Sequence, residues 1–98
     1  MGDIKDAQKE AWTIAEEKGF HSDDRSRAKA LALIHSEVSE ALEADRHDES
    51  KSSYAEELAD IVIRVLDHAE EQDIDLEQHI YAKMSENRER EYKHGKEY

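Results

Sequence analysis

Apolar residues recur every three or four positions near the start of the chain, and this spacing predicts an amphipathic helix over about 4–18. The stripe consists of Ile4, Ala7, Ala11, Trp12 and Ala15. Gly19 then fits a left-handed C-terminal cap. We expect Phe20 to fold back on the helix as the apolar contact of this cap.

A second apolar stripe predicts a helix that extends to about Arg46. Its N-cap is expected among Ser22, Asp23 and Asp24. The stripe itself consists of Leu31, Ile34, Val38, Ala41 and Leu42. Residues 45–52 are polar and predict a turn.

The third predicted helix has the widest apolar arc, about half of its circumference. It opens with Ser53 and Glu56 in a capping-box pattern. The arc consists of Leu58, Ala59, Ile61, Val62, Ile63, Val65 and Leu66. Such an arc predicts a central helix that contacts several neighbours. The remaining polar stripe consists of Glu57, Asp60, Arg64 and Asp67.

A fourth helix is expected after residues 73–75, with Asp75 as its N-cap and Gln78 completing the capping box. Leu76, Ile80 and Met84 form its expected inner face. Short connections favour antiparallel neighbours. We therefore predict an all-α, four-helix bundle-like protomer that spans residues 1–98 as one domain.

Composition agrees with this class. The chain has 98 residues, no Pro and three Gly, with 37% hydrophobic and 41% charged residues. A chain this small and polar buries only a modest core. We therefore expect partner subunits to complete it. Disorder is the competing interpretation of this composition, but the apolar residues are periodic rather than scattered.

The charge of the chain restricts its partners. A net charge of −12 argues against binding to nucleic acid or to an anionic membrane. The absence of Cys excludes disulfides and thiolate metal sites. The sequence shows no signal region and no apolar run of membrane-spanning length. We expect a soluble, cytoplasmic protein.

Two acidic pairs are the main candidates for chemistry. Glu37 and Glu40 lie three apart in the second helix, and Glu57 and Asp60 lie three apart in the third. Residues at this spacing share a helix face, and antiparallel pairing would bring all four to the same height. Four carboxylates suit Mg²⁺, with Mn²⁺ as a substitute. Because the chain has 26 acidic residues, an ordinary solvated helix surface explains any single pair better than a metal site does. The conjunction of two pairs, both bordering apolar stripes and both equidistant from one turn, favours the metal site.

The spacing of these pairs resembles the signature of the MazG-like all-α nucleoside triphosphate pyrophosphohydrolases. The similarity includes Glu-Val-Ser-Glu-Ala at 37–41 and Glu-Glu-Leu-Ala-Asp-Ile-Val-Ile at 56–63. A third block, which contains Lys83, Asn87, Arg90 and Lys96, is similar to the family's C-terminal phosphate-contacting segment. The resemblance covers about 12–96.

The resemblance implies Mg²⁺-dependent hydrolysis of nucleoside triphosphates to the monophosphate and pyrophosphate, by attack of a metal-activated water at the α-phosphorus. It implies a homodimer or homotetramer. The implied metal ligands are Glu37, Glu40, Glu57 and Asp60, of which Glu37 and Glu40 are also assigned to catalysis. We expect Glu40 to act as the general base, since it lies furthest from the apolar stripe of its helix.

The implied phosphate contacts are Lys83, Asn87, Arg90 and Lys96. A solvated helix surface is the alternative for Lys83 and Asn87, because Glu86, Glu89 and Glu91 interleave this basic block. Arg64 fits an ordinary helix salt bridge with Asp60.

Aromatic residues offer a weaker prediction. Trp12 and Phe20 could stack on a nucleobase, although a Trp on an amphipathic helix more often lies in a core or a subunit interface. His21 and His35 could offer hydrogen bonds near the site, and Asp67 could be an outer metal ligand or accept a hydrogen bond behind the ligands, but we expect all three to be exposed.

Other functions stay open at this point. Within the enzyme class, the alternatives are a phosphoribosyl-ATP hydrolase and a dimeric dUTPase-like enzyme. Outside it, the chain could be a non-enzymatic acidic helical oligomerisation module, or an antitoxin-like protein that covers a basic partner. The preferred base and sugar are not determined by the sequence.

Overall fold

The computed structural model describes residues 3–21, 26–47 and 51–90. Within them the chain forms four α-helices and no strands, which confirms the predicted all-α class. The helices are α1 (Ile4–Glu17), α2 (Arg27–Arg46), α3 (Lys51–Glu71) and α4 (Leu76–Arg88). In this part of the chain, no helix combines the length and the apolar character needed to cross a membrane. Ser22, Asp23, Asp24, Glu91 and Lys96 lie outside the described residues.

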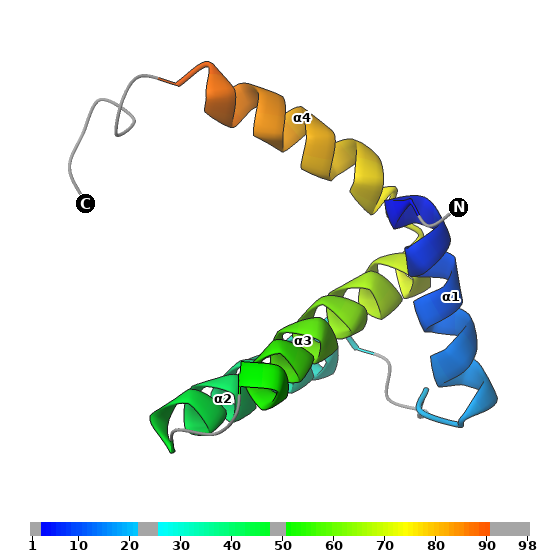
Figure 1. Cartoon of the computed structure of the whole chain (residues 1–98). Coiled ribbons are helices and arrows are strands. Elements are labelled where there is room, and N and C mark those ends of the chain that lie inside the picture. Colours follow the sequence, from blue (N-terminus) through cyan, green and yellow to red (C-terminus); the bar gives the residue numbers. More distant parts are fainter. Residues whose placement is uncertain (1–2, 22–25, 48–50, 91–98) are drawn as a thin grey trace.

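Helix α3 is the centre of the fold, as its wide apolar arc predicts. It packs along α2 on one side and against α1 near its C-terminal end. Figure 1 shows α2 and α3 lying side by side and running in opposite directions, with α1 crossing them at a steep angle. The two long helices therefore form an antiparallel hairpin, which is the arrangement that the acidic pairs require.

The end of α1 follows the predicted cap. The N–H of Gly19 donates to the carbonyl of Glu16 at 3.1 Å, and the N–H of Phe20 donates to that of Ala15 at 2.9 Å. With Gly19 at φ +72°, these two bonds form a Schellman motif. The expected apolar contact is wrong, because Phe20 is 73% exposed.

Three helix starts are capped by side-chain oxygens. Asp3 accepts the N–H of Asp6 at 2.8 Å and thereby caps α1. For α2 the cap is Ser26, which accepts the N–H of Lys29 at 3.1 Å, so the expected cap among residues 22–24 is wrong. Asp75 caps α4, as predicted. Each cap satisfies a donor that would have no partner within its helix.

The predicted start of α3 is wrong. The helix begins at Lys51, so Ser53 and Glu56 lie inside it and do not form its N-cap. Nothing in residues 51–53 breaks a helix, since Pro and Gly are absent there. The helix therefore extends by two residues past the polar signal that predicted its start.

The core is shallow. Its buried apolar residues are mostly small: Ala11, Ala15, Ala41, Ala44, Leu66 and Ala69. Many larger apolar side chains of the described residues stay exposed. The radius of gyration is 15.9 Å, whereas a compact domain of about 100 residues has about 13 Å. A single copy of the chain is therefore more open than a closed helical bundle.

One side of the α2–α3 hairpin is apolar. One stripe of α2 faces α3. The residues one position after this stripe turn to one side of the hairpin; they are Leu31, Val38 and Leu42. Because the helices are antiparallel, the corresponding residues of α3 turn to the same side. All are exposed. We call this surface the apolar face; it consists of Leu31, Val38, Leu42, Tyr54, Leu58 and Val62.

Helix α4 does not complete a four-helix bundle within one chain. Its first residues pack beside α1, and it then leads away from the hairpin (Figure 1). Leu76 and Ile80 line a crevice shared with α1 and α3. Met84, the third expected inner residue, is 56% exposed. Met84 therefore does not lie on an inner face of the single chain, because none of the helices in the described ranges packs opposite it.

Gly19→Ala should lower the free energy of unfolding by about 1 kcal/mol, which is about 4–8 °C in Tm for a domain of this size. The cause is the backbone, since a Cβ at Gly19 would meet nothing within 4 Å. Circular dichroism during thermal unfolding measures the effect. Gly19→Asn is the matched control and should lose less, because Asn tolerates the left-handed region better. Equal losses for both variants would contradict this explanation.

Candidate functional site

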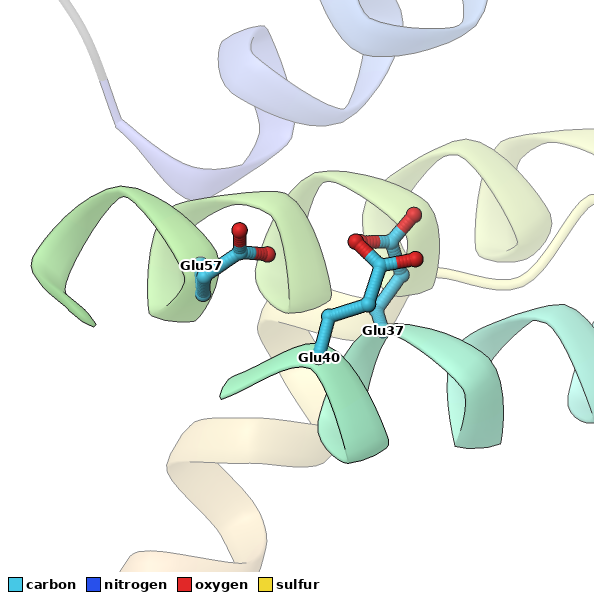
Figure 2. A group of neighbouring side chains, drawn as sticks. All are labelled: Glu37, Glu40 and Glu57. Carbon is cyan, nitrogen blue, oxygen red and sulfur yellow. The ribbon is translucent and has the colours of Figure 1, made fainter. Parts of the chain in front are cut away.

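Three of the four predicted metal ligands converge. One carboxylate oxygen each of Glu37, Glu40 and Glu57 lies within 4.8 Å of the others. Figure 2 shows these side chains reaching toward one another from α2 and α3. Glu37 and Glu57 are half-buried, whereas Glu40 is exposed. We call this group the acidic cluster.

The cluster lies at the seam between the two helices. Glu37 belongs to the stripe of α2 that faces α3, together with Ala41 and Ala44, both of which are buried. One oxygen of Glu57 is shielded from solvent on the opposite helix. Alanine on the same stripe allows the helix backbones to approach closely. The glutamates are therefore held by helix packing and not by mobile loops.

Asp60 lies apart from the cluster. It is exposed and lines a groove together with Glu37 and Arg64. A step of three residues turns a helix by about 300°, so Asp60 is rotated by about 60° from Glu57. This rotation places one acid in the helix seam and the next on the wall of the groove.

An arginine compensates part of the negative charge. Arg64 Nε donates to Glu37 Oε2 at 2.6 Å. The Glu37 side chain is 13% exposed, so its charge is screened less by water than an ordinary surface charge. The sequence equally allowed a bond from Arg64 to Asp60 within α3. The structure instead places the guanidinium across the helix seam.

The groove runs beside the cluster between α1, α2 and α3. Its volume is about 310 Å³, which is at the lower end of the range for small-molecule sites. Its apolar lining includes Ala15, Leu33 and Ile63, and its polar lining includes Lys29, His68 and Glu71. Glu37 and Asp60 also line it, so the groove and the acidic cluster share one wall.

The two aromatic candidates have different surroundings. Phe20 lines the groove at its α1 end. Trp12 is half-buried and donates from Nε1 to Glu71 Oε1 at 2.7 Å. Its ring also lies against His21, with centroids 5.1 Å apart. Phe20 is therefore accessible to a ligand in the groove, whereas Trp12 contributes to the contact between α1 and α3.

His21 and Asp67 are more enclosed than expected. The His21 side chain is only 9% exposed, and its ring nitrogens lie 2.7 Å from Glu16 Oε1 and 2.8 Å from Asp67 Oδ1. Burial alone would lower the pKa of His21. The hydrogen bonds to Glu16 and Asp67, and the negative charges of both, outweigh burial and raise that pKa above its usual value.

The sequence held only a weak signal for this arrangement. His21 follows the cap at Gly19, where the chain turns back toward its own helix, and Asp67 continues the polar stripe of α3. Neither position predicts the other, since 46 residues separate them. His35 is exposed, as expected.

Of the predicted phosphate contacts, Lys83 and Asn87 lie on α4 and Arg90 follows its end, and none of these three is brought to the acidic cluster; Lys96 lies outside the described residues. Lys83 Nζ donates to Glu86 Oε1 at 2.8 Å, and both side chains are exposed. This hydrogen bond and the charge of Lys83 lower the pKa of Glu86. Asn87 and Arg90 are also exposed. In the single chain, α4 points away from the hairpin that carries the cluster (Figure 1).

Comparisons of the chain with protein-family models, with curated proteins and with solved structures gave no match. The chemistry of the site is therefore argued from its residues. The acidic cluster offers only carboxylate oxygens, which are the ligands that Mg²⁺ and Mn²⁺ prefer. Its donor set fits a hard divalent cation, and Asp60 could join it from the groove wall.

Glu40→Gln should stabilise the cation-free protein slightly, by about 0.2–0.5 kcal/mol, because it removes a like charge from the cluster. The same change should reduce the rise in Tm that Mg²⁺ causes, since a cation that binds only the folded state stabilises it. Thermal unfolding with and without Mg²⁺ measures both effects. Glu10→Gln, on the exposed surface of α1, is the control and should leave the Mg²⁺ effect unchanged. A full Mg²⁺ effect in Glu40→Gln would exclude Glu40 as a ligand.

Proposed function

We propose that this protein is a Mg²⁺-dependent, MazG-like hydrolase that converts nucleoside triphosphates to the monophosphate and pyrophosphate. The observation that carries the proposal is the convergence of Glu37, Glu40 and Glu57 from two antiparallel helices beside a groove. These residues belong to the motifs that resemble the family. The spacing of the motifs and their arrangement in space therefore support the same function.

The acidic cluster would hold the cation through Glu37, Glu40 and Glu57, with Asp60 adjacent. When bound, Mg²⁺ neutralises phosphate charge and makes water easier to deprotonate. Without such compensation, a chain of net charge −12 would repel a triphosphate. Arg64 and Lys29 are the Arg and Lys side chains that line the groove.

Glu40 is the best candidate for the general base. Glu37 is ion-paired with Arg64 and largely shielded, whereas Glu40 is exposed to incoming water. In the proposed reaction, Glu40 takes a proton from a water molecule while the oxygen of that water forms a bond to the α-phosphorus. The bond from that phosphorus to the bridging oxygen breaks, and pyrophosphate leaves with the electron pair. Positioning and charge stabilisation account for most of the catalysis in such reactions.

The groove would hold the nucleoside. Phe20 is exposed at its α1 end, and small residues such as Ala11 and Ala15 leave room along its wall. A planar base could stack on the Phe20 ring. Lys83, Asn87, Arg90 and Lys96 are proposed to contact phosphate only in an assembly in which α4 approaches an acidic cluster.

The apolar face favours a second candidate function, which is an acidic helical oligomerisation module. Six exposed apolar side chains on one side of the hairpin are unusual for a monomer. A second copy of the chain is a suitable partner, because the face carries no charged residue that would repel its equivalent. Oligomerisation is also expected of the proposed enzyme, so activity and not assembly distinguishes the two functions.

Glu37→Ala and Asp60→Ala should each reduce turnover by about 100-fold or more, the scale on which one electrostatic contact stabilises a transition state. The measurement is pyrophosphate release from a panel of canonical and modified nucleoside triphosphates, with and without Mg²⁺. Glu10→Ala should retain full activity, and circular dichroism should show that all variants stay helical. If the wild type releases no pyrophosphate from any substrate with Mg²⁺ or Mn²⁺, the oligomerisation module is the better explanation.

Leu42→Lys and Leu58→Lys should weaken self-association, because each places a charge in the centre of the apolar face. Sedimentation velocity over a range of protein concentrations measures the change. Ile14→Lys is the matched control, since Ile14 is exposed to a similar extent but lies on α1, outside the apolar face. A wild-type protein that stays monomeric at high concentration, or Lys variants that associate as well as the wild type, would rule out this interface.

A further inference from the structure

His21 lies between two acids on different helices. Its Nδ1 is 2.7 Å from Glu16 Oε1 near the end of α1, and its Nε2 is 2.8 Å from Asp67 Oδ1 on α3. Only 9% of the side chain is exposed. The His21 ring thus joins the C-terminal end of α1 to α3.

The number of protons decides which form of the ring fits. Carboxylates only accept hydrogen bonds, and a neutral imidazole has a single N–H. At neutral pH, a neutral His21 ring and two ionised carboxylates carry one N–H between them. Hydrogen bonds from the ring to both Glu16 and Asp67 need two, so one further proton is required. Imidazole ordinarily gains a proton near pH 6.5 and carboxylates only near pH 4. The extra proton thus belongs on His21.

We propose that His21 is an imidazolium clamp that fixes the end of α1 to α3 and holds the wall of the groove in place, and that loss of one proton releases it. The proposal concerns the groove whether or not the groove binds a nucleotide. In this proposal His21 is a positioning residue, because its ring would act on a ligand only by holding the end of α1 and the following Phe20 in place.

The surroundings of the ring favour its charged form. On α1, Trp12 lies against it with a centroid distance of 5.1 Å, within the range for attraction between a cation and an aromatic ring. The two acids add hydrogen bonds and negative charge, which outweigh burial and raise the pKa of His21. Among the described residues, further titratable or charged groups line the groove that His21 borders: Lys29 and Glu37 on α2, and Asp60, Arg64, His68 and Glu71 on α3.

Deprotonation would affect the groove directly. A neutral ring can donate to Glu16 or to Asp67 but not to both, so one carboxylate would face a nitrogen lone pair. Phe20 is the neighbour of His21 in sequence, and both line the groove. When the clamp releases, the segment that follows α1 and carries the Phe20 ring loses its hydrogen bond to Asp67 on α3. A ligand that stacks on Phe20 would then bind to a less ordered wall.

The direction of the pH effect follows from the raised pKa. A group whose pKa is higher in the folded state contributes stability that is complete below its unfolded value, near 6.5. That stability is lost as the pH rises from this value through the folded pKa. The clamp is therefore closed in weakly acidic solution and opens on the alkaline side of pH 6.5.

Trp12 provides the readout, because it is the only Trp in the chain and a protonated imidazole quenches indole emission. In the full chain, Trp12 emission should rise with pH, with a midpoint above 6.5. Nitrogen NMR of the ring should show both nitrogens protonated at pH 6. Glu16→Gln and Asp67→Asn keep the size of each partner and remove its charge, so each should move the midpoint down.

His21→Asn should abolish the emission change, whereas His79→Gln should preserve it, since His79 is exposed on α4. Release of the helix end is measured by hydrogen exchange at the Phe20 amide, corrected for the intrinsic effect of pH. Its protection should fall severalfold above the midpoint in the wild type and stay constant with pH in His21→Asn. A His21 midpoint at or below 6.5, or Phe20 protection that does not change as His21 titrates, would overturn the clamp.

Discussion

Acidic side chains inside the contact between α2 and α3 are the constraint on which the rest of this structure depends. Glu37 and Glu57 occupy seam positions that apolar residues would ordinarily fill. Charges that are withdrawn from water destabilise a fold unless opposite charges or hydrogen bonds compensate. Arg64 compensates Glu37 in part. The helix pairing therefore holds in place a group of like charges that a cation would relieve.

The composition of the seam also explains why the chain is open. On the α2 side, the buried residues of the seam are alanines, Ala41 and Ala44. Small residues let the helices approach but bury little apolar area, and burial of apolar area is the main source of stability. Larger apolar residues of the apolar face, such as Leu42 and Leu58, lie one position further along each helix and so point outward. Site geometry and incomplete burial thus have the same origin.

The sequence predicts the helices well because their signals are local. Periodicity identifies all four helices, Gly19 marks the end of α1, and Asp75 marks the start of α4. The start of α3 is missed because the capping pattern at Ser53 competes with helix formers before it. A local pattern states that a residue can cap a helix, but not that the helix must begin there.

The candidate site is predicted less completely because its geometry depends on contacts between helices. Pairing α2 with α3 brings Glu37, Glu40 and Glu57 together, as the spacing indicates. Rotation about α3 separates Asp60 from them, although a spacing of three suggests a shared face. The direction of α4 and the partner of His21 depend on long-range packing, for which periodicity carries no information.

The two walls of the groove share one electrostatic arrangement. At the α2 end, Arg64 is bonded to Glu37, and at the α1 end, His21 lies between Glu16 and Asp67. Arg64 is thus engaged by an acid, and so is His21 in its proposed charged form, so neither can turn to an anion without giving up an acidic partner. Arg64 can turn to a phosphate only where another positive charge replaces it beside Glu37. Under the proposed function, this exchange would make binding of the anionic substrate depend on prior occupancy of the acidic cluster.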